Sequence, residues 1–232
     1  MRLLMRLKYV NMLRFVLLTM LVLSACSSRA QVQNTASDKP PTLASGFKSI
    51  LDTFQPIYNF RKGEVIASVG AGLGFQEVVY SLMADSLTFY LQDINISGLA
   101  TQNLESNVQQ IYRNAGHTYC NTTFLTYRGT ETNTNLPGQT FDKIIAEHSL
   151  HEFTHPSEML QSIRSNLKPG GILFILEQIA KRLNRKYPVC GRTMFTEQSL
   201  VTLLNENGFL YVNKMPINSA NGGGIVFRFE RK

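Results

Sequence analysis

The sequence predicts an α/β fold with a largely parallel sheet covered by helices on both faces. From residue 65 onward, short apolar segments typical of buried strands alternate with helix patterns, an order that favours parallel strands joined by crossover helices. The 232 residues are 44% hydrophobic and 17% charged, so the chain can bury one large domain or two small ones and differs from disordered chains and coiled coils. We find no internal repeat.

The predicted strands are short apolar runs bounded by glycine, proline or polar residues. The run at 143–146 is the clearest of them and closely follows the turn Pro137-Gly138, whereas the run at 124–127 is weaker. In chain order the strand predictions are residues 65–69, 87–91, 124–127, 143–146, 172–176, 209–212 and 225–229.

Helices are predicted between these strands from apolar stripes and from start and stop signals. Pro156 begins one helix, which extends through Leu167 to the turn at 168–171. Thr196 is the predicted N-cap of another helix, which ends before Gly208. The helix predictions are residues 47–54, 75–84, 97–115, 156–167 and 197–207.

The amino terminus has the pattern of an export signal. Basic residues up to Arg14 precede the apolar run 15–23, and small residues follow at a cleavage point. The apolar run is half as long as the ~20 residues that a membrane-spanning helix needs. Leu23-Ser24-Ala25-Cys26 resembles the bacterial lipobox, whose cysteine becomes lipid-modified and begins the mature protein. We therefore expect a signal peptide at 1–25 and lipidation at Cys26, with a plain secretory signal as the alternative.

Residues 26–46 are predicted to form a lipid-anchored, flexible tether, because they are rich in polar side chains and have hardly any apolar ones. A domain follows at 47–232. The residue after Cys26 is Ser27 and not the aspartate that favours retention in the inner membrane. The expected localisation is the bacterial cell envelope, in the outer rather than the inner membrane of a Gram-negative cell.

The net charge gives no case for a nucleic-acid partner. The first 26 residues hold four basic residues and no acid, so the rest of the chain carries +3 of the formal net charge of +7. Such a balance is ordinary for a domain of this size.

A glycine-rich loop, Gly70-Ala71-Gly72-Leu73-Gly74, follows the first predicted strand and precedes a helix. Glycines let the backbone turn sharply and let a ligand approach main-chain N–H groups. In the dinucleotide fingerprint the third glycine would stand at Phe75, so this G-x-G-x-G spacing differs from it. Asp93 stands 19 residues beyond Gly74, at the end of the second strand, where a carboxylate can accept hydrogen bonds from both ribose hydroxyls. Helix capping is the alternative role for Asp93, although Asn95 could fill it.

Four features in register resemble motifs of class I S-adenosylmethionine-dependent methyltransferases. They are residues 62–75 with the glycine loop, Asp93, Phe141-Asp142-Lys143-Ile144-Ile145, and Asn166-Leu167-Lys168-Pro169-Gly170-Gly171. The resemblance covers roughly residues 47–232. It implies a Rossmann-like seven-stranded sheet, mostly parallel with the last strand antiparallel, and S-adenosyl-L-methionine as a cofactor across the carboxyl ends of the first strands.

The resemblance also implies roles for single residues. The glycine loop would face the methionine part, Asp93 would hold the ribose, and Glu131 would lie near the adenine. Glu147 and His148, which end the fourth strand, would face the sulfonium and the substrate. Ser68 stands where the family usually has an acid, two positions before the first glycine. The implied cofactor-binding residues are Gly70, Ala71, Gly72, Gly74, Asp93, Glu131 and Glu147.

Methyl transfer requires a nucleophile aligned with a carbon on a positively charged sulfur, and alignment alone supplies much of the rate enhancement. An oxygen or nitrogen acceptor also benefits from a general base. His148 and His151 are the catalytic candidates, and for each the alternative is a loop histidine without a chemical role.

Residues 151–155, His-Glu-Phe-Thr-His, match the zinc signature H-E-x-x-H. That chemistry requires a continuous helix, and Pro156 disfavours a helical conformation at His155. Glu177 lies at a distance suited to a third ligand of some zinc proteases. We therefore rank a zinc hydrolase using His151, Glu152 and His155 last and predict no bound metal.

The predicted function is an exported, membrane-anchored, monomeric methyltransferase that acts on a small-molecule or lipid acceptor. The alternative is a non-catalytic binding lipoprotein on a degenerate methyltransferase fold, because the cofactor is made in the cytoplasm and Ser68 departs from the family pattern. Residues 178–195 hold five basic residues and no acid, and we expect a solvated loop that faces a membrane, with a cover over an anionic acceptor as the alternative. Cys120 and Cys190 could pair in an oxidising compartment.

Overall fold

The structure is a computed structural model that describes residues 45–217 and 223–232. The predicted signal peptide, the lipidation at Cys26 and nearly all of the tether lie outside these residues. Among the helices of the described segments, none combines the length and the apolar character needed to cross a bilayer.

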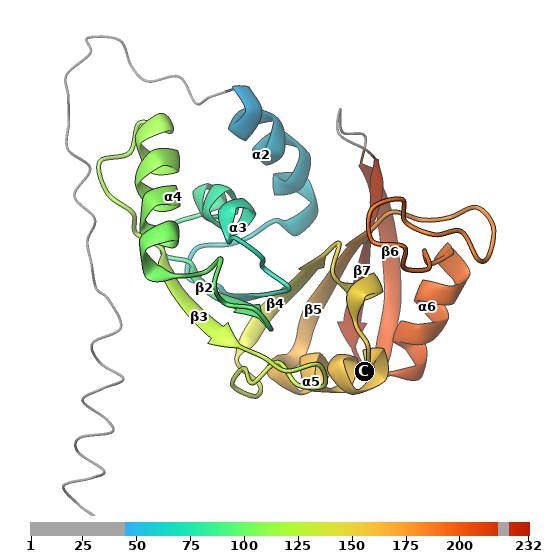
Figure 1. The fold of residues 1–232 in the computed structure, drawn as a ribbon. Helices are drawn as coiled ribbons and strands as arrows, with labels where there is room; N and C mark the ends of the chain where they lie inside the picture. Colours follow the sequence, from blue (N-terminus) through green and yellow to red (C-terminus); the bar gives the residue numbers. More distant parts are fainter. Residues whose placement is uncertain (1–44, 218–222) are drawn as a thin grey trace, which may run out of the picture. The chain divides into compact units, whose positions relative to one another are not determined.

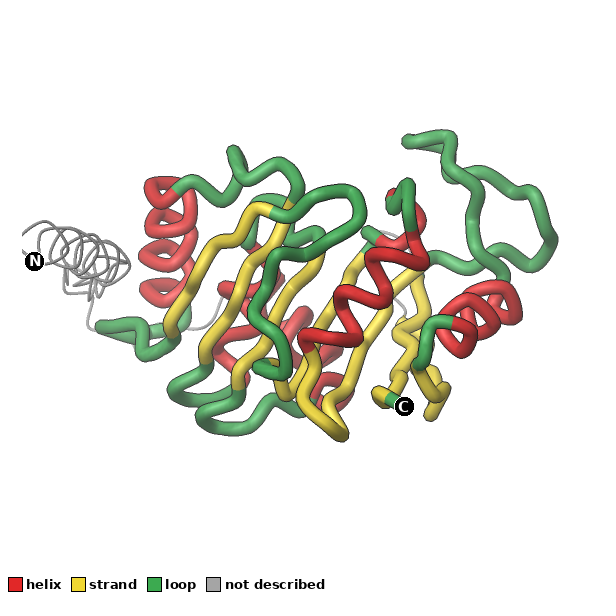
Figure 2. The backbone as a smooth tube through the Cα atoms, turned by 90° about the horizontal axis from the view of Figure 1, so that it is seen from below, coloured by secondary structure: helices red, strands yellow, loops and turns green. Residues whose placement is uncertain are grey.

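A seven-stranded sheet forms the centre of the fold, in the order β3-β2-β1-β4-β5-β7-β6 (Figures 1 and 2). The strands β1 to β5 pair in parallel, and β7 runs antiparallel to both of its neighbours. This confirms the predicted fold class, including the antiparallel last strand. The strands are β1 Val65–Val69, β2 Thr88–Asp93, β3 Thr123–Arg128, β4 Phe141–Glu147, β5 Leu167–Glu177, β6 Phe209–Ile217 and β7 Gly224–Arg231.

Helices cover both faces of the sheet, with α2, α3 and α4 on one side and α5 and α6 on the other (Figure 1). In β1, Ile66 packs into the first of the two cores and Ala67 into the second. Since both faces are buried, the central strands are almost continuously apolar. The helices are α2 Ser45–Tyr58, α3 Phe75–Tyr80, α4 Thr101–Asn114, α5 Pro156–Asn166 and α6 Glu197–Glu206, with short 3₁₀ turns η1 Ser81–Met83 and η2 Leu150–Glu152.

The structure corrects the end of one predicted helix. Helix α5 stops at Asn166, and Leu167 is instead the first residue of β5, paired with Phe141. Pro169 cannot continue a helix and drives Lys168 out of the helical conformation, and the pairing with Phe141 extends the strand back to Leu167. The turn predicted at 168–171 is an irregularity within the strand, and Gly170 has a φ of 75° there.

The predicted N-cap of α6 is present. The side chain of Thr196 accepts a hydrogen bond from the Ser199 N–H, and the Ser199 side chain accepts one from the Thr196 N–H, which together form a capping box. The capping box fixes the end of the long loop between β5 and α6, residues 178–196 (orange in Figure 1). Arg192 of this loop lines the cavity described below.

Candidate functional site

A cavity of about 510 Å³ lies where β1, β2 and β4 end. Parallel strands place their carboxyl ends at one edge of the sheet, and ligands of open α/β sheets bind in the crevice outside that edge. The residues that line the cavity are Val69, Gly70, Gly72, Gln92, Asp93, Ile94, Thr130, Glu131, His148, Ser149, Glu152, Phe153, Thr154, Met159 and Arg192.

The glycine loop forms one wall of this cavity. The N–H groups of Gly70 and Ala71 donate to the main-chain oxygen of Gln92, at 2.9 and 3.0 Å. Gly70 has a φ of 78°, and a Cβ atom there would lie 2.5 Å from the Cβ of Ser149, so only glycine fits without a shift of the loop. Gly72 has a φ of 58°, and a Cβ atom there would meet nothing within 4 Å. The main chain at Gly72 is therefore open to a ligand.

The carboxylate of Asp93 lies against this loop. Its Oδ2 accepts a hydrogen bond from the Gly72 N–H at 2.9 Å, and its Oδ1 accepts one from the Asn95 N–H at 2.9 Å. Each carboxylate oxygen has a further lone pair, so Asp93 can still accept hydroxyl groups. The alternative role of helix capping does not apply, since the N-cap of α4 is Ala100.

Of three other residues expected at the cofactor, one lines the cavity and two do not. Glu131 lines the cavity, and its side chain is 62% exposed. Gly74 lies outside the lining, because a Cβ atom there would be 3.0 Å from the side chain of Leu91 and 3.1 Å from that of Leu99. Ala71 packs against the core on the α2 side. Gly74 and Ala71 thus give the loop its shape and do not face the cavity.

Glu147 also lies away from the expected place. Its carboxylate accepts hydrogen bonds from the hydroxyls of Tyr58, at the end of α2, and Tyr80, at the end of α3, the latter at 2.8 Å. Burial raises the pKa of Glu147 above its ordinary value. The side chain therefore belongs to a buried polar cluster under α2 and is not among the cavity lining, contrary to the expectation that it faces the sulfonium.

A carboxyl group stands beside Ser68, where the resembled family carries an acid. Glu77, from the first turn of α3, accepts a hydrogen bond from the Ser68 hydroxyl at 2.6 Å. Both side chains are buried, and Glu77 Oε2 has no hydrogen-bond partner in the described part of the chain. Burial raises the pKa of Glu77 to about 7. The helix thus supplies beneath the glycine loop the carboxyl group that the strand lacks.

The two candidate bases occupy different positions. His148 lines the cavity with a φ of 52°, and its N–H donates to the main-chain oxygen of Leu176 at 2.8 Å. Burial lowers the pKa of His148, so its imidazole is neutral near pH 7 and can accept a proton. His151 does not line the cavity, and its Nδ1 lies 2.9 and 3.0 Å from the two carboxylate oxygens of Glu177.

The H-E-x-x-H segment is not one helix. His151 and Glu152 belong to the 3₁₀ turn η2, whereas His155 is the N-cap of α5 and Pro156 is its first residue. His155 Nε2 instead lies 3.9 Å from the carboxylate of Glu131. The two histidines are therefore not one helical turn apart on the same helix, as the zinc signature requires.

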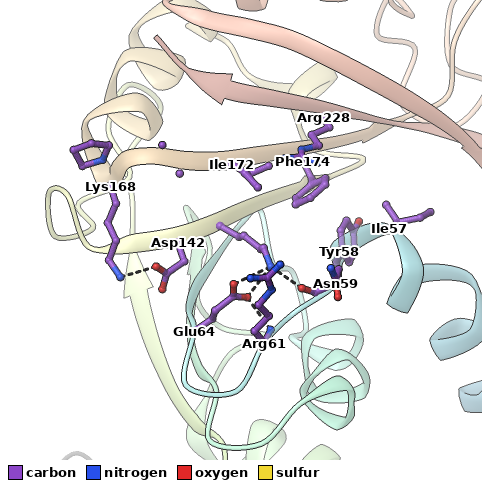
Figure 3. Close-up of a pocket in the computed structure, with 14 residues that line it drawn as sticks. Ile57, Tyr58, Asn59, Arg61, Glu64, Asp142, Lys168, Ile172, Phe174 and Arg228 are labelled. Atoms are coloured by element: carbon purple, nitrogen blue, oxygen red, sulfur yellow. Dashed lines mark hydrogen bonds and ion pairs between the residues drawn. The ribbon is translucent and has the colours of Figure 1, made fainter.

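A second cavity, of about 330 Å³, lies at the amino ends of the strands (Figure 3). Both of its lysines have acidic partners, whereas the buried Nε of Arg228 has none among the described residues. Lys143 Nζ lies 2.7 Å from Glu64 and donates to the Asn59 oxygen at 2.8 Å, and Lys168 Nζ lies 2.7 Å from Asp142.

The groups in the first cavity fit an adenosyl cofactor. Gln92 is buried, and its Oε1 has no hydrogen-bond partner among residues 45–217 and 223–232. Buried polar atoms are normally paired, so this oxygen calls for a donor from a ligand. Together with the open main chain at Gly72 and the carboxylate of Asp93, it offers acceptors for the amine and hydroxyl groups of a nucleoside.

Several residues at or beside the cavity were not anticipated from the sequence. Gln92 and Ser149 line it, and Tyr187 donates a hydrogen bond to the fully buried Glu177 at 2.7 Å. Glu177, the last residue of β5, was noted in the sequence only as a possible metal ligand, and its place at the end of a buried strand is the signal for a role beside the cavity. Nothing local marks Tyr187. The described Cys120 and Cys190 are free thiols.

Comparisons with known proteins agree with this architecture. A family model of a methyltransferase domain matches residues 48–214. Among solved structures, a SAM-dependent methyltransferase from Aquifex aeolicus is 19% identical over 80% of this chain and 97% of its own, with a TM-score of 0.55. The 1,6-didemethyltoxoflavin-N1-methyltransferase of Burkholderia thailandensis, solved with 1,6-didemethyltoxoflavin and S-adenosylhomocysteine, is 16% identical over 81% and 78%, with a TM-score of 0.57.

A third similar structure is the [4+2]-cyclase SpnF, which is 15% identical over 94% of this chain and 92% of its own, with a TM-score of 0.58. At these identities the solved structures show a shared fold. No curated protein matches the chain.

Proposed function

The chain belongs to the methyltransferase-domain family within the class I S-adenosylmethionine-dependent methyltransferases, and from this premise we propose that it is an exported, lipid-anchored enzyme that methylates a small-molecule or lipid acceptor. The observation that carries the proposal is the contact of 2.9 Å between Asp93 Oδ2 and the Gly72 N–H at the edge of a cavity of about 510 Å³. S-adenosylmethionine, the cofactor of this family, supplies a methyl group on a positively charged sulfur.

Different residues of the chain bind the cofactor and accept the proton. Asp93 and the main chain at Gly72 hold the ribose side, and the unpaired Oε1 of Gln92 and the carboxylate of Glu131 bind the remaining polar edge of the nucleoside. His148 accepts the proton that an oxygen or nitrogen acceptor loses when it is methylated, because its imidazole faces the cavity and is neutral.

Export and anchoring are supported by the sequence. We infer that Cys26 is lipid-modified and that residues 26–46 tether the domain to the bacterial cell envelope, at the outer membrane if the cell is Gram-negative. Labelling with radioactive palmitate tests this inference: the native chain should be labelled, Cys26→Ala should lose the label, and Cys190→Ala should keep it. Equal labelling of the native chain and Cys26→Ala would contradict the anchor.

Calorimetry of the purified full chain with S-adenosylmethionine tests the proposal that the chain is a methyltransferase. We expect binding clearly tighter than millimolar and a loss of about 10-fold to 100-fold in Asp93→Ala, since hydrogen bonds to a charged group contribute about 1.5–3 kcal/mol. Asp85→Ala is the matched control, because Asp85 is exposed, precedes β2 at its amino end and accepts a hydrogen bond from Asn121 far from the glycine loop. Its affinity should equal that of the native chain.

The predicted export favours a second candidate, a non-catalytic binding lipoprotein on a methyltransferase scaffold, although Glu77 supplies a carboxyl group beside Ser68. The cofactor is made in the cytoplasm, and a fold of this kind also occurs in a cyclase. Absent or millimolar binding of S-adenosylmethionine by the native chain would favour this candidate over the enzyme.

A further inference from the structure

Three side chains with metal-binding atoms meet at the rim of the cavity. His151 and Glu152 come from η2, and Cys190 comes from the loop between β5 and α6. One ligand atom from each of them lies within 4.8 Å of the other two. Glu152 also lines the cavity, so the group borders the site described above.

The imidazole of His151 is already oriented as in a metal site. Its Nδ1 is held by the carboxylate of Glu177, at 2.9 and 3.0 Å, and Glu177 is fully buried. A carboxylate at Nδ1 keeps the proton on that nitrogen and leaves the lone pair of Nε2 free for a metal. Tyr187 fixes the arrangement, because its hydroxyl donates to Glu177 at 2.7 Å and its ring stacks on the imidazole at a centroid distance of 4.0 Å.

We propose that His151 Nε2, the Glu152 carboxylate and Cys190 Sγ bind one Zn²⁺ ion, a site that does not depend on the proposed methyl transfer. A nitrogen, an oxygen and a sulfur donor suit zinc better than magnesium or calcium, which prefer oxygen. Ligands of tetrahedral zinc, at about 2.0–2.3 Å from the ion, lie about 3.3–3.8 Å apart. Glu152 Oε1 is 3.8 Å from His151 Nε2, and the exposed Cys190 side chain needs to approach only slightly.

The chemistry of this site differs from that of the H-E-x-x-H motif. Binding removes the proton of the Cys190 thiol to solvent, and three protein ligands leave a fourth position for water or for an acceptor atom. The second histidine of the motif, His155, has no part in it, since its Nε2 lies beside Glu131. A metal on His151 Nε2 would also exclude that nitrogen from accepting a proton, which leaves His148 as the base.

The test uses the purified full chain, stripped with a chelator and titrated with Zn²⁺ against a chromophoric competitor in the absence of any cofactor. We expect one zinc ion per chain, a loss of affinity of at least about 100-fold in Cys190→Ser, and a loss of about 10-fold to 100-fold in Glu177→Gln, whose side chain supports a ligand. Cys120→Ser and His155→Ala are the matched controls and should bind zinc as the native chain does.

Cobalt gives a second, spectroscopic readout that does not depend on enzymatic activity. Co²⁺ bound to the native chain should show thiolate-to-metal charge-transfer absorption, and Cys190→Ser should lack it while its circular dichroism is unchanged. The absence of zinc binding at micromolar concentrations, or a loss of binding in His155→Ala but not in Cys190→Ser, would overturn the proposal. Either result would leave the calorimetric test of S-adenosylmethionine binding unaffected.

Discussion

The two cavities at opposite ends of the strands differ in the kind of polar groups that they hold and in the partners of those groups. At the amino ends, Lys143 is paired with Glu64 and Lys168 with Asp142 (Figure 3). At the carboxyl ends, Gln92 Oε1 has no partner in the described chain, and the main chain at Gly72 is open. The lysines of the more highly charged cavity are therefore paired within the chain, and its unpartnered atom is a donor, Arg228 Nε, whereas the carboxyl-end cavity holds an unpartnered acceptor.

This contrast shows that charge alone does not identify a site. A buried cation whose hydrogen bonds are met within the chain stabilises the fold, whereas a buried acceptor without a donor indicates a ligand. Three sets of substitutions test this account of the two cavities and of the glycine loop.

The largest expected effect is the loss of the buried pair at the amino ends. In the pair of Lys143 and Glu64 the side chains are only 8% and 18% exposed, so Glu64→Ala should lower the free energy of unfolding by about 3–5 kcal/mol. Lys168→Met is the control, because its pair with Asp142 is 42% and 30% exposed and should contribute less than about 1 kcal/mol. Urea denaturation measures both. Equal effects of the two substitutions, or a loss of cofactor affinity in either, would remove the distinction between the cavities.

The next effect concerns the carboxyl group beneath the glycine loop. Because burial raises the pKa of Glu77 from 4.5 to about 7, the native state keeps a proton that the unfolded chain loses between these values. The contribution of Glu77 to stability is thus fully present below pH 4.5, falls as the pH rises to about 7, and declines by about 3 kcal/mol in all.

Glu77→Gln should remove this decline, so that the variant gains stability relative to the native chain as the pH rises from 5 to 8. Denaturation series at several pH values measure the difference. A difference between variant and native chain that does not change with pH would contradict the raised pKa.

The smallest difference, about 1–3 kcal/mol between two glycine substitutions, separates the cost of a steric clash from the cost of the backbone conformation. Gly70 and Gly63 have almost the same φ, 78° and 80°, but a Cβ at Gly70 would lie 2.5 Å from Ser149, whereas one at Gly63 would meet nothing within 4 Å. Gly63→Ala should cost about 1–2 kcal/mol and Gly70→Ala about 1–3 kcal/mol more. Only Gly70→Ala should also weaken cofactor binding. Equal costs would show that the loop yields to a side chain.

The fold and the part of the cavity formed by the glycine loop and Asp93 could be predicted from the sequence, because both depend on local patterns. The strand, the glycines and Asp93 follow one another within 30 residues, so their spacing places Asp93 beside Gly72. The position of Glu147, which was expected at the sulfonium, instead depends on contacts between distant segments. Tyr58 and Glu147 are 89 residues apart in the sequence. No local pattern shows that the Tyr58 hydroxyl donates a hydrogen bond to the Glu147 carboxylate and holds it away from the cavity.

Contacts between distant segments also explain the corrected end of α5 and the carboxyl group beside Ser68. Leu167 continues the apolar stripe of α5, but its pairing with Phe141 places it in β5. The role of the missing acid at Ser68 could not be assigned from the strand alone, because Glu77 approaches from the neighbouring helix.

Amide hydrogen exchange of the full chain with and without S-adenosylhomocysteine tests the central claim most directly. Slower exchange in peptides that cover residues 70–74 and 92–95, with no change at 168–171, is the predicted result, because the ligand would cover the open main chain at the carboxyl ends of β1 and β2. Protection confined to the amino-end cavity, or no protection anywhere at saturating ligand, would contradict it.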